Sequence, residues 1–199
     1  SDGKRLATKS IDGGASVWDV TSGKLIVSLE GEDTYYGPVV FSPDDRFIAR
    51  SIGLADLGVC ESSTGRLVVR LVGHTEAAMP ITFDEDGDFL ASIGLDKTIR
   101  IWRWASSELI SKIPTEESSW ASSRMSVYLG RFVPSTGEFL TAWGAKTLRW
   151  WNVETGEMTR EATIPQSPEF VVETLSPSLR TIVSVNSGEN LVSAYFSDS

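Results

Sequence analysis

The segment FLASIGLDKTIRIW, residues 89–102, decides the fold of this chain. Apolar residues dominate its two halves, a lone Asp96 lies between them, and Trp102 closes it. Short runs rich in Ile, Leu, Phe and Trp on either side of a polar turn are typical of two neighbouring β-strands. The segment is either part of an active site or one copy of a repeat, and the spacing of similar segments distinguishes the two.

Three landmarks recur along the chain at nearly the same interval. The apolar residue of the first strand matches Leu6, Ile48, Leu90, Leu140 and Ile182, with steps of 42, 42, 50 and 42 residues. The closing position matches Trp18, Cys60, Trp102, Trp151 and Tyr195, with steps of 42, 42, 49 and 44. An earlier apolar position matches Phe41, Phe83, Phe132 and Leu175, with steps of 42, 49 and 43. A register shared by three landmarks indicates an internal repeat.

Each repeat contains four short apolar stretches bounded by Gly, Pro, Asp or Ser. In the third repeat they are MPITF (79–83), FLAS (89–92), TIRIW (98–102) and ELISKI (108–113). Such stretches predict β-strands, and no segment shows the sustained periodicity of a helix. The sequence therefore predicts an all-β fold with four strands in each complete repeat.

The pattern resembles the WD-repeat β-propeller family. The resemblance is carried by VWDVTSGK (17–24), FSPDDRFIA (41–49), the Gly73-His74 dipeptide and FLASIGLDKTIRIW (89–102). It implies four-stranded antiparallel blades, of which seven typically ring a central channel. The expected blades are approximately residues 1–31 (partial), 32–73, 74–115, 116–165 and 166–199 (partial).

The ends of the chain predict an incomplete ring. The first residue is Ser1 rather than Met, and Ser1-Asp2-Gly3 aligns with Pro43-Asp44-Asp45, inside a turn. We therefore expect a segment of a longer protein with about 18 strands, in three whole and two partial blades. Open sheet edges are prone to aggregation, so we expect this segment alone to be poorly soluble.

The resemblance also implies a buried, hydrogen-bonded set of four side chains in the third repeat. The members of this expected structural tetrad are His74, Ser92, Asp96 and Trp102. The other repeats depart from it: the first keeps Thr8 or Ser10, Asp12 and Trp18, the second has Glu32, Arg50 and Cys60, and the fourth has Ala145 and Trp151. Trp18, Cys60 and Trp151 are the expected core positions of their repeats.

A catalytic Ser-His-Asp set is the competing interpretation of His74, Ser92 and Asp96. It is disfavoured because the chain has no G-x-S-x-G nucleophile elbow and because Ser92 would lie within a strand beside a core Trp. The acidic run DEDGD (84–88) does not match a calcium loop, and one His and one Cys give no metal-site spacing. We expect no catalytic residue, metal site or cofactor.

The charge and composition narrow the choice of partners. A net charge of −9 and a pI near 4.7 argue against nucleic acid, whose binders usually carry a basic surface. Arg and Trp alternate in IRIWRW (99–104), which could suggest stacking on nucleic acid. Strand alternation instead places Arg100, Trp102 and Trp104 on one face, and core packing is expected for the Trp residues. No stretch is long enough to span a membrane and no signal peptide is present. The single cysteine fits a reducing compartment, which favours the cytoplasm.

Aromatic residues in loops between blades are the candidate partner-binding residues. They are Tyr35, Tyr36, Trp120 and Trp143. By the loop geometry of the family, these connections lie on one face of the ring, and Trp and Tyr are enriched at interface hot spots. The alternative is that each aromatic side chain only covers its own blade and contacts no partner.

We therefore expect a non-catalytic scaffold that binds proteins, with basic partners favoured by its acidity. The alternative is a recognition or sensor module of a larger enzyme or signalling protein, with a kinase, protease or nucleotide-binding domain outside these residues.

Overall fold

The structure is a computed structural model that describes residues 3–10, 14–29, 37–115, 130–143, 147–163, 170–175, 181–186 and 192–196. Side chains are described only up to residue 163, and not at residue 143. The chain divides into two compact units, Ser1–Ser118 and Ser119–Ser199, and each is described by itself. Among the described residues, no helix is long and apolar enough to cross a membrane.

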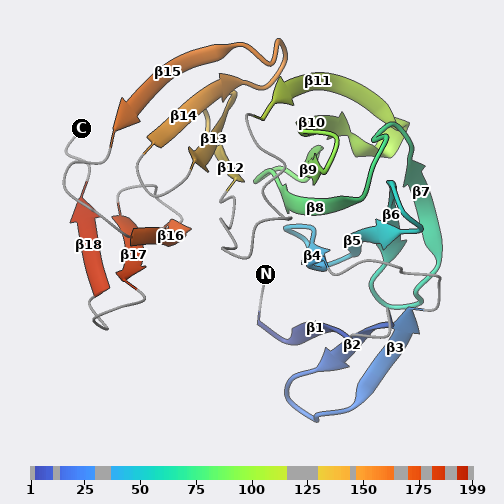
Figure 1. The fold of residues 1–199 in the computed structure, drawn as a ribbon. Helices are drawn as coiled ribbons and strands as arrows, with labels where there is room; N and C mark the ends of the chain where they lie inside the picture. Colours follow the sequence, from blue (N-terminus) through green and yellow to red (C-terminus); the bar gives the residue numbers. More distant parts are fainter. Residues whose placement is uncertain are drawn as a thin grey trace. The chain divides into compact units, whose positions relative to one another are not determined.

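The first unit contains three antiparallel sheets whose strands are ordered as in the chain (Figure 1). The first sheet has β1 (Arg5–Lys9), β2 (Ala15–Asp19) and β3 (Leu25–Leu29). The second has β4 (Val40–Phe41), β5 (Phe47–Ile52), β6 (Asp56–Glu61) and β7 (Leu67–Leu71). The third has β8 (Ala78–Phe83), β9 (Phe89–Gly94), β10 (Thr98–Arg103) and β11 (Glu108–Pro114).

The second unit contains two further antiparallel sheets. One has β12 (Gly130–Val133), β13 (Glu138–Trp143), β14 (Thr147–Asn152) and β15 (Met158–Thr163), and the other has β16 (Phe170–Leu175), β17 (Thr181–Asn186) and β18 (Val192–Phe196). The described residues thus form three four-stranded and two three-stranded sheets. The all-β fold with four-stranded antiparallel blades is confirmed, while the exact bounds of the blades remain a prediction.

The second and third sheets pack face to face, with residues of strands β5 to β10 between them. β9 and β10 are buried along almost their whole length, whereas β7, an outermost strand, is mostly exposed. Strand β8 contacts β4, β5 and β6. The core between these sheets consists of Ala49, Leu57, Val59, Leu71, Ala78, Phe83, Leu90, Trp102 and Trp104. Burial on both faces explains why these middle strands are rich in Ile, Leu and Val.

A β-bulge recurs at the same place in the first four sheets. The register shifts between Val17 and Trp18, Val59 and Cys60, Ile101 and Trp102, and Trp150 and Trp151. Each bulge brings an apolar residue of the outermost strand opposite the closing position of the repeat: Leu25, Leu67, Leu109 and Met158. The repeat in sequence is therefore a repeat in backbone geometry, including its irregularity.

The three expected core positions differ in burial. Cys60 is fully buried and Trp151 is 7% exposed, but Trp18 is only half-buried. Trp18 lies opposite Leu6 and Leu25, which are themselves 53% and 48% exposed. Among the described residues, this face of the first sheet is therefore largely exposed, whereas the matching face around Trp102 is covered by the second sheet.

The prediction that Trp104 shares a strand face with Arg100 and Trp102 is wrong. β10 ends at Arg103, and Trp104 begins a short 3₁₀ turn, Trp104–Ser106, which ends where Ser107 adopts a left-handed conformation (φ 59°). The turn lets the Trp104 ring pack between the sheets, 4.9 Å from Phe47 and 6.1 Å from Phe83 between ring centroids.

Candidate functional site

The four side chains of the expected tetrad form a continuous chain of hydrogen bonds in the third sheet. Ser92 on β9 and Trp102 on β10 are joined by the indole N–H, which donates to the Ser92 hydroxyl at 2.8 Å. His74 precedes β8, and its Nε2 lies 2.9 Å from the same hydroxyl. Its Nδ1 lies 3.0 Å from both carboxylate oxygens of Asp96, in the turn between β9 and β10.

Each donor in this network of hydrogen bonds has an acceptor. The carboxylate of Asp96 only accepts, so Nδ1 of His74 carries the proton and Nε2 accepts from the Ser92 hydroxyl. Ser92 therefore donates to His74 and accepts from Trp102. Ser92 is 0% exposed and His74 is 6% exposed, and a buried polar network is stabilising only when every member has a partner.

Thr98 and Arg100 complete the network around Asp96, although the four-residue pattern of the tetrad does not include them. The Thr98 hydroxyl donates to Asp96 at 2.6 Å, and the Arg100 guanidinium lies 3.3 Å from the same carboxylate. The Arg100 side chain is only 8% exposed and lies over the Trp102 ring at 5.9 Å. Their signal is the alternation in TIRIW (98–102), which places Thr98, Arg100 and Trp102 on one strand face.

Burial and hydrogen bonding set the charges of the network. Burial lowers the pKa of His74 below its usual 6.5, although the hydrogen bond to Asp96 works in the opposite direction. Burial alone would raise the pKa of Asp96, but hydrogen bonds from Thr98 and His74 outweigh it and lower the pKa to about 2. At neutral pH the network therefore holds a neutral imidazole and a carboxylate that faces the Arg100 cation.

The other repeats keep only part of this arrangement. The Trp18 indole donates to Thr8 and the Trp151 indole donates to Thr141, each at 2.8 Å. In the second repeat Cys60 is fully buried and Arg50 is 5% exposed. Asp12, Glu32 and Ala145 lie outside the described residues.

The geometry argues against the catalytic interpretation of His74, Ser92 and Asp96. A nucleophilic serine must be accessible to its substrate, but Ser92 is fully buried beneath the second sheet. Its oxygen also accepts the Trp102 indole N–H. Within the described ranges, no group of three or more His, Cys, Asp or Glu side chains is placed to hold a metal ion.

The structure describes no side chain of the candidate partner-binding residues. Tyr35, Tyr36 and Trp120 lie outside the described residues. Trp143 ends β13, and its backbone alone is described. These four positions therefore stay a prediction.

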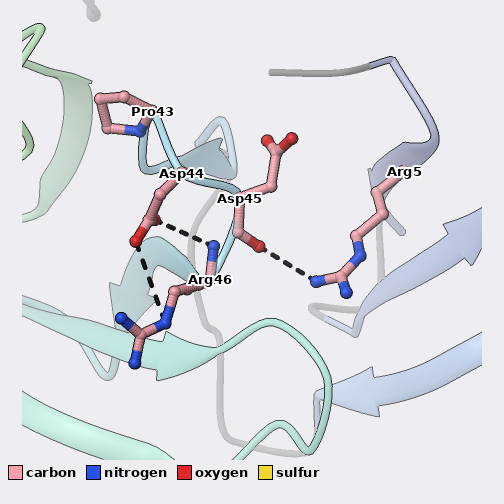
Figure 2. A pocket seen from close by; sticks show the side chains of 5 residues that line it. All are labelled: Arg5, Pro43, Asp44, Asp45 and Arg46. Atoms are coloured by element: carbon pink, nitrogen blue, oxygen red, sulfur yellow. Dashed lines mark hydrogen bonds and ion pairs between the residues drawn. The ribbon is translucent and has the colours of Figure 1, made fainter.

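Two surface hollows flank the turn between β4 and β5. The first, of about 290 Å³, lies between the first and second sheets and is lined by Arg5, Pro43, Asp44, Asp45 and Arg46 (Figure 2). Arg5 of β1 donates to the backbone carbonyl of Asp45 at 3.0 Å and to the Ser62 hydroxyl at 2.5 Å. An arginine of the first sheet thus connects it to the second sheet across this junction.

The second hollow, of about 330 Å³, lies between the second and third sheets. Its lining consists of Ser42, Pro43, Asp44, Phe47, Glu85, Asp86, Gly87 and Trp104. The Trp104 indole donates to the carbonyl of Gly87 at 2.7 Å, which fixes the ring against the β8–β9 turn. Residues 84–88 alone do not predict this hollow, because its other walls come from residues 42–47 and from Trp104.

The comparisons with known proteins agree with the repeat and the fold. No family model matches the chain. Nuclear distribution protein nudF of Aspergillus niger, a WD-repeat protein, is 26% identical over 157 residues, which are 78% of this chain and 28% of that protein. The chain therefore spans little more than a quarter of that curated relative.

Two solved structures share the fold. A chain in the crystal structure of the mitotic checkpoint complex superposes with a TM-score of 0.72 at 19% identity, over 98% of this chain and 59% of that one. The computationally designed Ika8 protein gives a TM-score of 0.68 at 18% identity, over 99% and 57%. With its 42-residue repeat and its four-stranded antiparallel sheets, the chain has a β-propeller fold and a repeat similar to that of WD-repeat proteins.

Proposed function

We propose that the chain is a non-catalytic scaffold that binds other proteins through the loops connecting successive blades. The observation that carries this proposal is the burial of the one histidine-serine-aspartate set inside the third sheet, with every member bonded to another side chain. Because these buried side chains bond one another, we assign them to the stability of the blade and assign partner binding to the surface.

The loops are the best candidates on that surface. Rigid sheets hold connecting loops in fixed positions, and binding residues are disproportionately found on such loops. Tyr36 and Trp120 offer large rings in polar loop sequences, which suits interface hot spots. The acidity of the chain favours basic partners, since opposite charge speeds encounter.

The experiment is capture of proteins from a cell extract on the immobilised chain, followed by quantification of each captured protein. Trp120→Ala and Tyr36→Ala are each expected to weaken capture of at least one protein about tenfold or more, as hot-spot residues do. Trp150→Ala is the matched control, because Trp150 is a partly exposed Trp that lies on strand β14 and outside the loops. Unchanged capture with both loop variants would overturn the proposed binding face.

The alternative, a recognition module of a larger enzyme, predicts the same loop-dependent capture. It differs in requiring a catalytic domain elsewhere in the full protein, so the full-length coding sequence distinguishes it from a free-standing scaffold.

A further inference from the structure

The two hollows beside the β4–β5 turn occupy the same position in successive repeats. Arg5 and Phe47 are 42 residues apart, as are Asp45 and Gly87, and Ser62 and Trp104. In the first junction, the Ser62 hydroxyl donates to the backbone carbonyl of Asp45 at 2.5 Å. In the second, the equivalent Trp104 indole donates to the backbone carbonyl of the equivalent Gly87 at 2.7 Å. The two junctions are therefore built on one plan with different side chains.

The side chains that line the two junctions differ. In the first, the guanidinium of Arg5 reaches across from the preceding sheet. In the second, the equivalent residue is Phe47, which packs against Trp104. Hollows of similar size, about 290 and 330 Å³, lie at the two junctions, and only the second has aromatic walls. The volume of the second hollow is at the lower end of the roughly 300–1,000 Å³ typical of ligand pockets, which suits a single long side chain.

The second hollow combines aromatic walls with carboxylates at its edge. Phe47 and Trp104 line it, together with Asp44, Glu85 and Asp86. Glu85 and Asp86 are exposed, and no cation among the described residues pairs with either. Asp44 accepts the Ser42 hydroxyl at 2.6 Å and the Arg46 backbone N–H at 3.0 Å, and its carboxylate lies 3.9 Å from the Arg46 guanidinium, with both of these charged side chains more than half exposed.

Negative charges at this edge also act on Asp84, a neighbouring carboxyl group. Burial raises the pKa of Asp84, and the charges of Asp88 and Asp86 raise it further. The Phe47 ring already attracts one guanidinium, that of Arg46, at 5.4 Å from its centroid. A planar guanidinium both stacks on aromatic faces and bonds carboxylates in a way that a lysine ammonium does not.

We infer that the hollow lined by Phe47, Trp104, Glu85 and Asp86 binds an arginine side chain from a basic segment of a partner protein. The inference rests on the proposed function, since it names the chemistry of one partner contact. It places that contact on the turns β4–β5 and β8–β9, and not on the loops that carry Tyr36 and Trp120.

The test uses three fluorescein-labelled heptapeptides, Gly-Ser-Gly-X-Gly-Ser-Gly, with X as arginine, lysine or citrulline. Citrulline keeps the shape of arginine without its charge. Fluorescence polarisation with the full chain is expected to show the arginine peptide binding about fivefold more tightly than citrulline and more tightly than lysine, the range of one well-placed exposed ion pair. Equal affinities for arginine and citrulline would overturn the inference.

Matched variants locate the site. The double variant Glu85→Gln/Asp86→Asn is expected to lose the arginine preference, whereas Glu76→Gln/Glu157→Gln, which removes the same charge from exposed positions elsewhere, is expected to keep it. Equal losses in both would indicate a diffuse charge effect and refute the site. Because these side chains are exposed, folding is expected to be unchanged, which circular dichroism verifies.

A second readout places the peptide beside Trp104. In a ¹⁵N-correlated NMR spectrum, the indole N–H signal of Trp104, assigned by its disappearance in Trp104→Phe, is expected to shift with the arginine peptide and not with citrulline. An unmoved Trp104 signal on binding would contradict the inference. Loop-dependent capture without any arginine preference would refute this inference alone, and an arginine preference without loop-dependent capture would refute only the proposed loop face.

Discussion

Trp102 donates its indole N–H to the hydroxyl of Ser92 on the adjacent strand at 2.8 Å. The same bond, at the same length, joins Trp18 to Thr8 and Trp151 to Thr141. This indole-to-hydroxyl bond between the two middle strands is the part of the buried network that three repeats share, and only the third repeat extends it to a histidine and an aspartate.

Losing this bond is expected to lower the free energy of unfolding more where the bond is more buried. Trp102→Phe leaves Ser92 without its indole donor in the core and is expected to lower the free energy of unfolding by about 1–3 kcal/mol. Trp18→Phe, at a half-buried position where water can replace the indole, is expected to cost about 1 kcal/mol or less. Urea denaturation of both variants measures the difference, and equal losses would contradict this ranking.

The Asp96–Arg100 ion pair is expected to matter more than an exposed pair of the same charge type. Both side chains are less than a tenth exposed, so Asp96→Ala leaves a buried guanidinium without its anion and is expected to cost about 3–5 kcal/mol. The control is Asp56→Ala, whose partner Arg70 is 58% exposed; there the expected cost is about 0–1 kcal/mol. A smaller loss for Asp96→Ala than for Asp56→Ala would refute the network as a stabilising element.

The pH dependence follows from the pKa values lowered in the folded state. The pKa of folded His74 lies below its usual 6.5, so between these values the unfolded chain binds more protons. The stability that His74 contributes is therefore complete above about pH 6.5 and is lost as the pH falls through the folded pKa. Asp96 acts in the same direction between 3.8 and about 2.

His74 is the sole histidine of the chain, so its titration can be followed without assignment. The Hε1 signal in proton NMR is expected to titrate with a midpoint below 6.5, and in Asp96→Asn the midpoint is expected to fall further because the carboxylate that favours the imidazolium is gone. A wild-type midpoint at or above 6.5 would show that burial does not dominate.

Gly94 is expected to be intolerant of a side chain for reasons of space. An added Cβ would collide with Nδ1 of His74 and Oδ1 of Asp96, so Gly94→Ala is expected to cost about 1–3 kcal/mol by overpacking. Gly53→Ala is the comparison, because Gly53 has open space around it but a left-handed φ of 62°; its cost is expected to be about 1–2 kcal/mol of backbone strain. Because the collision is with His74 itself, we also expect Gly94→Ala to change the pKa of His74 and Gly53→Ala to leave it unchanged. The same His74 pKa in both variants would contradict a collision within the network.

The strands and the repeat are predictable from the sequence because each depends on local alternation and on spacing. The segment around Trp102 predicts β9 and β10, and the 42-residue interval transfers that prediction to the other sheets. The end of β10 at Arg103 is not predictable in this way, because hydrophobicity does not change there. The chain instead enters a short 3₁₀ turn that redirects Trp104 and ends at Ser107, which has a left-handed conformation.

The candidate sites are only partly predictable. His74, Ser92, Asp96 and Trp102 can be named from the family pattern. Strand alternation also places Arg100 on the face of Trp102, but its burial and its ion pair with Asp96 cannot be predicted, because a strand arginine is normally solvated. The hollow at Phe47 and Trp104 depends on two turns from different sheets, which no single stretch of sequence reveals.

The central claim is that the buried polar network stabilises the blade while the loops bind partners. The most direct test compares Ser92→Ala with Trp120→Ala, measuring thermal unfolding and the capture of the same partner per folded molecule. We expect Ser92→Ala to lower the unfolding midpoint and leave capture unchanged, and Trp120→Ala to weaken capture about tenfold with the midpoint unchanged. Loss of capture in folded Ser92→Ala, with Trp120→Ala behaving as wild type, would contradict the account.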